Sequence, residues 1–556
     1  MQRLAGPSSL NILKYGAVAD AQTAFADCTL AVGTKSLVVS SAIFSSSDVG
    51  KIIGIARVAA PGYTAYVNYV TISSYVSSTN VILSANCSVS GTSVGPMSST
   101  PCGVVWGTDY YAAQVAACAV LTAAGGGSLY WPSGKYVSGR TIYLPNNVTM
   151  YGDGWSTVLY NAGMTGSLGF ATGPVVTNAG CLTNNPFQSN PIIYTSDATQ
   201  TDFDITIRDI QLDQIGSIAG GANKAIRFSL AKRIKVLRTK IIFPCVTGTA
   251  MAFIGVQDVE EVSNTSTGST IAHDHWKGCS KVKIASNNMV MATPSTQAIN
   301  LNGVGTSVND VEITEDCWIT DNHIVLNGSP SSAGLVAIFL DGLGAGSITR
   351  RVTVDGNTII GNSGQWNAGI IGRGVGGHFI ITNNILKNLG ADEVGSPLAP
   401  ILIGQHNATS GASLTNPMAS VAGSNLITFT YASHGIVDRM VTNGIWLHVP
   451  SMVFDGITFS TLNYYVITSV IDANTFVLKA PSNAVAGLTG GTGSYYIGWG
   501  ASNNCCINNN LIIAPIRGAE PIIEAGGIGH LVYNNNIQLT DSVDTYTLPA
   551  PIQVFE

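Results

Sequence analysis

The sequence predicts an all-β chain folded as a parallel β-helix, a solenoid in which short strands coil around one long core. Two observations predict it. A similar segment recurs four times, at Ser269–His275, Gln297–Gly303, Val336–Gly342 and Ala368–Gly374. Each copy is followed by a strand-like stretch and then by an asparagine with aliphatic neighbours. Imperfect repeats of this length without a helical period are typical of β-solenoids, in which no unit can bury its apolar face alone.

The asparagines form the second repeat. They are Asn288, Asn322, Asn357 and Asn384, spaced 34, 35 and 27 residues apart, and Asn510 and Asn536 repeat the pattern near the C-terminus. Stacked asparagines exchange side-chain hydrogen bonds between successive layers of strands. We therefore expect them at equivalent turns of successive rungs.

The composition narrows the function classes. Only 10% of the 556 residues are charged, and the net charge is −6 with no run of Lys or Arg, so we expect no nucleic-acid partner. No apolar run reaches the length of a membrane span, so we expect no membrane partner. The ten cysteines lack metal-ligand spacing, and no phosphate-binding or dinucleotide fingerprint occurs. We expect neither a metal nor another cofactor.

The chain begins with a strand-like stretch at Leu10–Asp20 and later contains one helical pattern. Thr108 or Asp109 can cap this helix, and Gly125–Gly127 ends it. Small and apolar residues fall on one face at helical spacing: Ala113, Ala116, Ala117, Val120 and Leu121.

Four motifs carry a family resemblance. They are Tyr15-Gly-Ala17, Gly107-Thr-Asp109, the stretch Gly125–Tyr136 and Gly152-Asp-Gly154. Together they resemble the pectate-lyase superfamily, and especially the tailspike depolymerases of bacteriophages. The resemblance implies a right-handed parallel β-helix whose N-terminal end is plugged by the helix, which would otherwise expose apolar core and strand edges.

Two stretches interrupt the solenoid pattern with alternating strands of their own, for example Asn80–Leu83 and Leu426–Thr430. We read them as small inserted β modules, the second looped out between Ile403 and Asn510. The expected organisation is an N-terminal segment with the first strand (1–27), an inserted β subdomain (28–105), the capping helix and main β-helix (106–414), a second β module (415–498), and the C-terminal rungs (499–556).

Strand alternation predicts a candidate site. If Ile271, Ile299, Ile338, Ile370 and Ile401 face inward, the residues three positions later face outward on neighbouring rungs about 4.8 Å apart. These outward residues include Asp274, Asn302, Asp341 and Arg373. A polar column of this kind suits a saccharide groove, although it could equally be a solvated face on which Asp341 and Arg373 merely pair. Further substrate contacts are expected from His275, Trp276 and Trp366.

Asp274 and Asp341 are the expected catalytic pair. Two rung steps put their backbones about 9–10 Å apart. Inverting glycosidases hold their carboxyl groups about 6.5–9.5 Å apart. Arg373 would keep Asp341 ionised as the base, which leaves Asp274 as the acid. The alternative pair is Glu312 and Asp355, expected to face outward on adjacent rungs.

Three functions remain open. The first is a phage-borne endoglycosidase that binds and cleaves bacterial surface polysaccharide, either capsule or O-antigen. The second is a polysaccharide lyase acting on a uronic acid, with Arg373 or a lysine as base. The third is a glycan-binding adhesin without activity, since fold alone does not give activity. The tailspike resemblance implies a homotrimer on the virion, attached to a tail or baseplate protein and acting at the bacterial cell surface.

Overall fold

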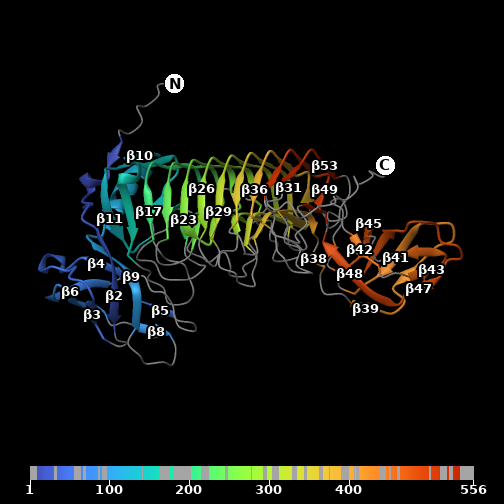
Figure 1. Ribbon diagram of the computed structural model, residues 1–556, viewed down its shortest axis with the longest axis horizontal. Helices are drawn as coiled ribbons and strands as arrows, with labels where there is room; N and C mark the ends of the chain where they lie inside the picture. The colour runs from blue at the N-terminus through green and yellow to red at the C-terminus, as the bar shows by residue number, and fades with distance from the viewer. Residues whose placement is uncertain are drawn as a thin grey trace, which may run out of the picture.

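The structure is a computed structural model, and three long parallel β-sheets dominate its fold (Figure 1). The described residues are 9–30, 34–55, 64–66, 70–85, 88–90, 97–140, 142–162, 176–178, 202–214, 224–243, 248–276, 278–291, 297–302, 312–327, 335–342, 347–361, 367–374, 376–389, 400–405, 407–408, 412–432, 434, 436, 446–449, 452–459, 464–499, 502–513, 522–524 and 530–538. Each turn of the chain adds one strand to each sheet in parallel register, which builds a β-helix. The predicted fold class is confirmed.

The three sheets are named here in the order in which the chain first enters them. The first sheet contains β1 (Leu10–Asn11), β10 (Gly127–Trp131), β13 (Val148–Gly152), β16 (Asp202–Arg208), β19 (Ala231–Leu237), β22 (Gln257–Val262), β25 (Ser280–Ala285), β28 (Glu312–Thr320), β31 (Ser347–Asp355), β35 (Ile380–Thr382), β50 (Cys506–Asn508) and β53 (Leu531–Tyr533), with β34 (Gly376–Gly377) and β49 (Ser502–Asn503) beside them. The second contains β11 (Gly134–Ser138), β14 (Thr157–Asn161), β17 (Gln211–Asp213), β20 (Lys240–Ile242), β23 (Thr265–Ser269), β26 (Asn288–Met291), β29 (His323–Leu326), β32 (Thr358–Ile360), β36 (Ile385–Lys387), β51 (Leu511–Ile513) and β54 (Asn536–Gln538). The third contains β12 (Ile142–Leu144), β15 (Val176–Asn178), β18 (Lys224–Ser229), β21 (Thr249–Ile254), β24 (Ile271–Trp276), β27 (Gln297–Asn302), β30 (Leu335–Gly342), β33 (Asn367–Gly374), β37 (Ile401–Gln405) and β52 (Ile522–Glu524).

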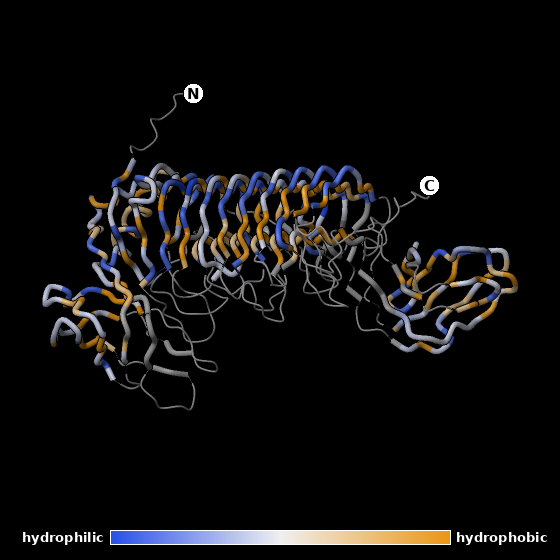
Figure 2. The backbone as a smooth tube through the Cα atoms, viewed as in Figure 1, coloured by the Kyte–Doolittle hydropathy of each residue, from blue (hydrophilic) through white to orange (hydrophobic). Residues whose placement is uncertain are grey.

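The core of the solenoid is a continuous file of apolar side chains in the lumen, the space that the three sheets enclose. Aliphatic residues repeat there at equivalent positions, as in the register line Ile299–Ile338–Ile370–Ile401 of the third sheet. Figure 2 shows hydrophobic and hydrophilic stretches alternating along the coils. Alternate residues of a strand face opposite ways, so this pattern buries one face of every strand.

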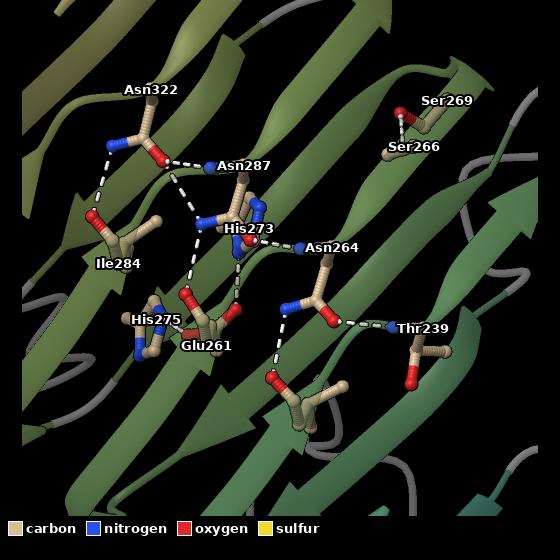
Figure 3. Close-up of polar contacts among 11 residues, drawn as sticks. Thr239, Glu261, Asn264, Ser266, Ser269, His273, His275, Ile284, Asn287 and Asn322 are labelled. Atoms are coloured by element: carbon tan, nitrogen blue, oxygen red, sulfur yellow. Dashed lines mark hydrogen bonds and ion pairs between the residues drawn. The ribbon is translucent and has the colours of Figure 1, made fainter. Parts of the chain in front are cut away.

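An asparagine ladder runs along the turn between the first and second sheets (Figure 3). Each side-chain oxygen accepts the backbone N–H of the equivalent residue on the preceding rung at 2.8–3.0 Å, which is Thr239 for Asn264, and each amide nitrogen donates to a backbone carbonyl of an earlier strand. The ladder consists of Asn264, Asn287, Asn322, Asn357, Asn384, Asn510 and Asn535.

The sequence placed two members of this ladder one residue too late. Asn288 and Asn536 begin β26 and β54, and the ladder positions belong to Asn287, which is buried, and Asn535, which is half-buried. The first site reads Asn-Asn and the second Asn-Asn-Asn in the sequence, so the pattern alone offered two choices at one and three at the other.

A second ladder, of alternating charge, runs across the strands of the first sheet. The residues all have left-handed backbone with φ between 53° and 59°, and they stack in the order Asp204, Arg233, Asp258, Lys281, Asp316 and Arg351. Arg233 binds Asp204 through two hydrogen bonds of 2.6 and 2.7 Å, and Arg351 binds Asp316 at 2.6 Å. Arginine and lysine rarely adopt this backbone conformation. We infer that stacking against acids of the adjacent rungs offsets the strain.

Helix α1 (Tyr111–Ala123) covers the N-terminal end of the lumen and packs against Ile12 and Leu129 in the same core. The Asp109 carboxylate accepts a hydrogen bond from the Tyr111 N–H at 3.0 Å. The predicted apolar face is wrong at two positions, because Ala116 and Val120 are exposed. Gln114 and Cys118 are buried instead, and the Gln114 amide donates to the Tyr143 carbonyl.

Two antiparallel modules extend from the solenoid (Figure 1). The first is a closed barrel of β2 (Gln22–Leu30), β3 (Ser36–Val39), β7 (Asn80–Leu83), β6 (Val70–Ser77), β4 (Ile52–Ile55) and β9 (Met97–Gly107). Ile52 and Val105 of this barrel pack against Val137 and Val158 on the outside of the second sheet. The short strands β5 (Thr64–Tyr66) and β8 (Ser88–Ser90) pair with each other.

The second module is a nine-stranded sheet with a core of its own, which includes Phe429, Phe476 and Tyr495. Its strands are β38 (Asn407–Ala408), β39 (Ala412–Leu414), β40 (Met418–Ala419), β41 (Leu426–Thr430), β42 (Trp446–His448), β45 (Tyr464–Asp472), β46 (Thr475–Lys479), β47 (Thr489–Gly490) and β48 (Gly493–Trp499). The pair β43 (Met452–Phe454) and β44 (Ile457–Phe459) lies within it.

Excision of the second module is expected to leave the β-helix folded. The rungs on either side of it pair directly, since β35 bonds to β50, β36 to β51 and β37 to β52. Replacing residues 407–499 by a short Gly/Ser linker should therefore keep β-type circular dichroism and a cooperative unfolding transition. A chain that is recovered only as aggregate would contradict this separation of cores.

Candidate functional site

The candidate site lies on the outer face of the third sheet, and the register there differs from the predicted one. His273 pairs with Ile299 and thereby occupies the lumen position, whereas the sequence alignment had matched Ile271 with Ile299. Asp274 therefore lies two residues away from the register line of Asn302, in which the sequence pattern had placed it. Asn302, Asp341 and Arg373 do share a register line, but their partner on β24 is Trp276.

Asp274 belongs to the neighbouring line of the same face. Its register partners on the following strands are Asn300, Phe339, Ile371 and Leu402, and the last three pack together in an outer apolar cluster. Along this register line, the outer face is thus polar at β24 and β27 and apolar from β30 onward.

A buried charge cluster caused the wrong alignment. His273 and His275 both point into the lumen, where they contact Glu261 of β22 (Figure 3). His275 Nε2 lies 2.6 Å from Glu261 Oε1, His273 Nδ1 contacts Oε2, and all three side chains are at most 1% exposed. A polar His at a lumen position cannot be recognised from its own strand, because its partner is on another sheet.

The two charges of the cluster stabilise each other. Burial by itself would raise the pKa of Glu261, but the charges of His275 and His273 lower it from 4.5 to about 2. Burial would lower the pKa of His275, but the Glu261 carboxylate raises it from 6.5 to about 10. His275 also stacks on Phe253, with ring centroids 4.8 Å apart. The predicted contact between His275 and substrate is therefore wrong, since the side chain faces the lumen.

This cluster gives an expected pH dependence of stability. The contribution of His275 is complete below pH 6.5 and is lost as the pH rises through about 10, because its folded-state pKa is raised. The contribution of Glu261 is complete above pH 4.5 and is lost as the pH falls through about 2. The melting temperature should therefore fall by a few degrees between pH 6.5 and 10. Glu261→Gln should melt lower at neutral pH and lose most of this alkaline slope, and a variant with the wild-type slope would contradict the assignment.

Asp274 is a buried carboxyl group with a defined set of donors. It is 3% exposed, and its Oδ1 accepts hydrogen bonds from Asn300 Nδ2 at 2.9 Å and from the Trp276 indole N–H. Burial raises its pKa, against the opposing effects of the Asn300 amide and the Lys224 ammonium group. A carboxyl group with a raised pKa on the outer face of a sheet has the properties of a general acid.

Asp341 lies on the same outer face and is fully buried, and its backbone carbonyl accepts a hydrogen bond from Thr349 Oγ1 at 2.7 Å. It is two rungs and two residues away from Asp274, which corresponds to a Cα separation of about 12 Å by strand geometry. The predicted stacking of the two acids in one column is therefore wrong. They lie on a diagonal, with Trp276 next to Asp274 and in the register line of Asp341.

The remaining predicted residues are the alternative catalytic pair and three expected substrate contacts. Glu312 and Asp355 do lie on adjacent rungs, β28 and β31, but Glu312 pairs with Ser347 and Asp355 with Thr320, eight register positions apart, so the two acids are not opposite each other. Asn302 is on the outer face and 6% exposed. Trp366 and the side chain of Arg373 lie outside the described residues.

The sequence missed three residues near Asp274, namely Lys224, Arg227 and Asn300. The first two lie on β18, two rungs before the recognisable repeats begin. Asn300 was assigned no role, because the alignment of Ile271 with Ile299 placed Asn300 and Asp274 in different outward columns. Arg227 and Asn300 share the register line Arg227–Ala252–Asp274–Asn300, whereas Lys224 is on the line of Thr249 and Ile271, and both lines require the pairing of β18, β21 and β24.

Within the described ranges, no group of three or more His, Cys, Asp and Glu side chains is arranged to hold a metal ion. No helix in this part of the chain is long and apolar enough to cross a membrane.

The comparisons with known proteins concern the fold. No protein-family model matches the chain, and no curated protein matches it. Among solved structures, the A-module of mannuronan C-5 epimerase AlgE6 from Azotobacter vinelandii is similar at 14% identity, with a TM-score of 0.37 over 78% of this chain and 93% of that one. The exopolygalacturonase of Thermotoga maritima is similar at 12% identity, with a TM-score of 0.28 over 53% of this chain and 75% of that one. The tailspike protein of E. coli bacteriophage HK620, in complex with a pentasaccharide, is similar at 11% identity, with a TM-score of 0.24 over 70% of this chain and 90% of that one.

Proposed function

We propose that the protein binds and cleaves a bacterial surface polysaccharide as an endo-glycoside hydrolase, on the outer face of the third sheet. The observation that carries the proposal is Asp274, a buried carboxyl group with a raised pKa that is held by Asn300 and Trp276. The face around it combines amide, carboxyl and indole groups on adjacent rungs. Long glycans need such a row of hydrogen-bonding groups and an aromatic face for the sugar rings.

In the proposed reaction, Asp274 donates its proton to the glycosidic oxygen as the bond to the leaving sugar breaks. Asp341 accepts a proton from the water that attacks the anomeric carbon from the opposite side. The diagonal separation of the two acids leaves room for this water and is too wide for a direct attack by the second carboxylate. The reaction therefore inverts the configuration at the anomeric carbon.

A second candidate, a polysaccharide lyase, is favoured by one observation. Burial lowers the pKa of Lys224, and the nearby charge of Arg227 lowers it further, although Asp274 opposes both. A lysine with a lowered pKa can act as the base that removes the proton next to a uronate carboxylate.

Product analysis separates these reactions. Hydrolysis gives a new reducing end, which NMR would show first as the inverted anomer, whereas elimination gives an unsaturated sugar that absorbs in the ultraviolet. The assay uses purified protein and capsular or O-antigen polysaccharides from a panel of bacteria. Binding without any cleavage across the panel would favour an adhesin and contradict the proposal.

The proposal extends to assembly and location. The protein would act as a homotrimer on the tail of a bacteriophage, attached to a tail or baseplate protein, at the surface of the host cell. Supporting features are the low charge content of the chain and exposed apolar side chains on the first and second sheets, such as Trp318, Ile380 and Ile385. Light scattering should give three times the mass of one chain, and a stable monomer would contradict the trimer.

A further inference from the structure

Two cationic side chains of β18 belong to the surroundings of Asp274. Lys224 and Arg227 both lie on β18, and Arg227 is two rungs from Asp274 in the same register line. The rung between them carries Ala252 at this position. Ala252 therefore places only a methyl group between the guanidinium and the carboxyl group.

Among the described residues, Arg227 of this pair has an unsatisfied donor. Lys224 is only 4% exposed, and its ammonium group interacts electrostatically with both Asp274 and Arg227. Arg227 Nε is buried and has no hydrogen-bond acceptor within the described part of the chain. A buried donor of a charged group that lacks an acceptor costs free energy, and two neighbouring cations add repulsion.

The arginines of the first sheet show the usual arrangement in this solenoid. Arg233 binds the carboxylate of Asp204 on the preceding rung, and Arg238 binds that of Asp209 with two hydrogen bonds of 2.6 and 2.9 Å. At Arg227 the corresponding position on the preceding rung belongs to Thr177, and the next rung carries Ala252, so neither neighbour is an acid. A purely structural role would have been served by an acid there.

Two hydrogen-bond acceptors that the described residues leave unsatisfied lie on the side of Asp274 opposite Arg227. Asn300 Oδ1 and Asn302 Oδ1 are buried and have no hydrogen-bond donor among the described residues. Both belong to β27 and face outward, in the lines of Asp274 and Trp276. Hydroxyl groups are the donors that such amide oxygens need.

We propose that Lys224 and Arg227 form a subsite for the acidic group of an anionic polysaccharide, while Asn300 and Asn302 accept hydrogen bonds from hydroxyl groups of the sugar on the far side of Asp274. This inference rests on the proposed function and names its substrate class. The glycan lies across the strands of the third sheet, so that the anionic group meets the guanidinium fork, which matches the paired oxygens of a carboxylate or a phosphate.

The test measures binding separately from cleavage. Asp274→Asn serves as the background, because it keeps the glycan intact. This protein is applied to immobilised bacterial polysaccharides, namely carboxylated ones, the same ones after carboxyl reduction, phosphate-bearing ones and neutral dextran. We expect retention on anionic polysaccharides only, and the carboxylated and phosphate-bearing arms identify the source of the anion.

Adding Arg227→Gln or Lys224→Met should weaken this retention roughly 10- to 100-fold, as expected for the loss of one charge-assisted hydrogen bond. Arg233→Gln is the matched control, since it removes a cation from the first sheet and should leave retention unchanged. Retention of carboxyl-reduced or neutral polysaccharide at equal strength, retention of none, or full retention by Arg227→Gln would each overturn the subsite.

The two proposals can fail separately. Cleavage of a neutral polysaccharide by the wild-type protein would keep the hydrolase and remove the subsite. Retention of an anionic polysaccharide that the wild-type protein leaves uncut would keep the subsite and remove the hydrolase.

Discussion

Asp274→Asn is expected to slow polysaccharide cleavage by about 10²- to 10⁴-fold, the contribution that a positioned general acid makes. An amide has nearly the shape of the carboxyl group, so hydrogen bonds from Asn300 and Trp276 can persist in altered form. The proton for the leaving oxygen is what the variant loses. Initial rates of reducing-end release measure the effect, and circular dichroism and melting temperature show whether the fold persists.

The control is Asp258→Asn. Asp258 is exposed on the first sheet with a φ of 58°, a backbone conformation that Asn also adopts readily. The variant protein should therefore cleave at the wild-type rate. Since burial raises the pKa of Asp274, the wild-type rate should also persist to higher pH than an ordinary aspartic acid allows and fall once this group ionises. Near wild-type cleavage by Asp274→Asn would move the catalytic acid elsewhere.

Asn322→Ala is expected to lower the free energy of unfolding by roughly 3–6 kcal/mol, because it leaves several buried backbone and side-chain groups without partners at about 1–3 kcal/mol each. Asn322 Oδ1 accepts from the backbone and side chain of Asn287, and its Nδ2 donates to the carbonyl of Ile284 and to Asn357 Oδ1. All of these contacts are buried. Denaturant titration followed by fluorescence measures the loss.

Asn288→Ala is the matched control for this ladder. Asn288 is exposed and directly follows a ladder residue, and within the described residues its side chain hydrogen-bonds only to the His323 ring, at 3.2 Å. Its substitution should change stability by no more than about 0.5 kcal/mol. Equal effects of the two substitutions would show that the ladder is not a principal source of stability.

The repeat pattern was sufficient to predict the β-helix, because stacked rungs reuse the same residue types at the same turns. Ile299, Ile338 and Ile370 gave the correct phase for three strands in succession. The pattern failed where His273 occupies the lumen, since a charge can be buried there only with Glu261 of another sheet, and no single strand reveals this pairing. A slip of two residues preserves the inward and outward faces and changes only the neighbours. The error therefore left Asp274 on the correct face and gave it the wrong partners.

The candidate site could be predicted only as far as the register of the strands was known. Asp274, Trp276 and Asn302 could be proposed from alternation within strands, but Lys224 and Arg227 required knowledge of which rung lies next to which. Their strand precedes the recognisable repeats, so the sequence offered no register for it. The chemistry of a solenoid surface is set by residues far apart in the chain that share a register line.

The alternation of acid and base between Asp204 and Arg351 has a consequence for how such a chain can change length during evolution. If the rung of Asp258 were deleted, Arg233 would stack on Lys281, and two cations would meet. If the rungs of Asp258 and Lys281 were both deleted, Arg233 would meet Asp316, and attraction would be restored. Gains and losses in this stretch are therefore expected in pairs of rungs, and descendants of one ancestor should differ there by even numbers.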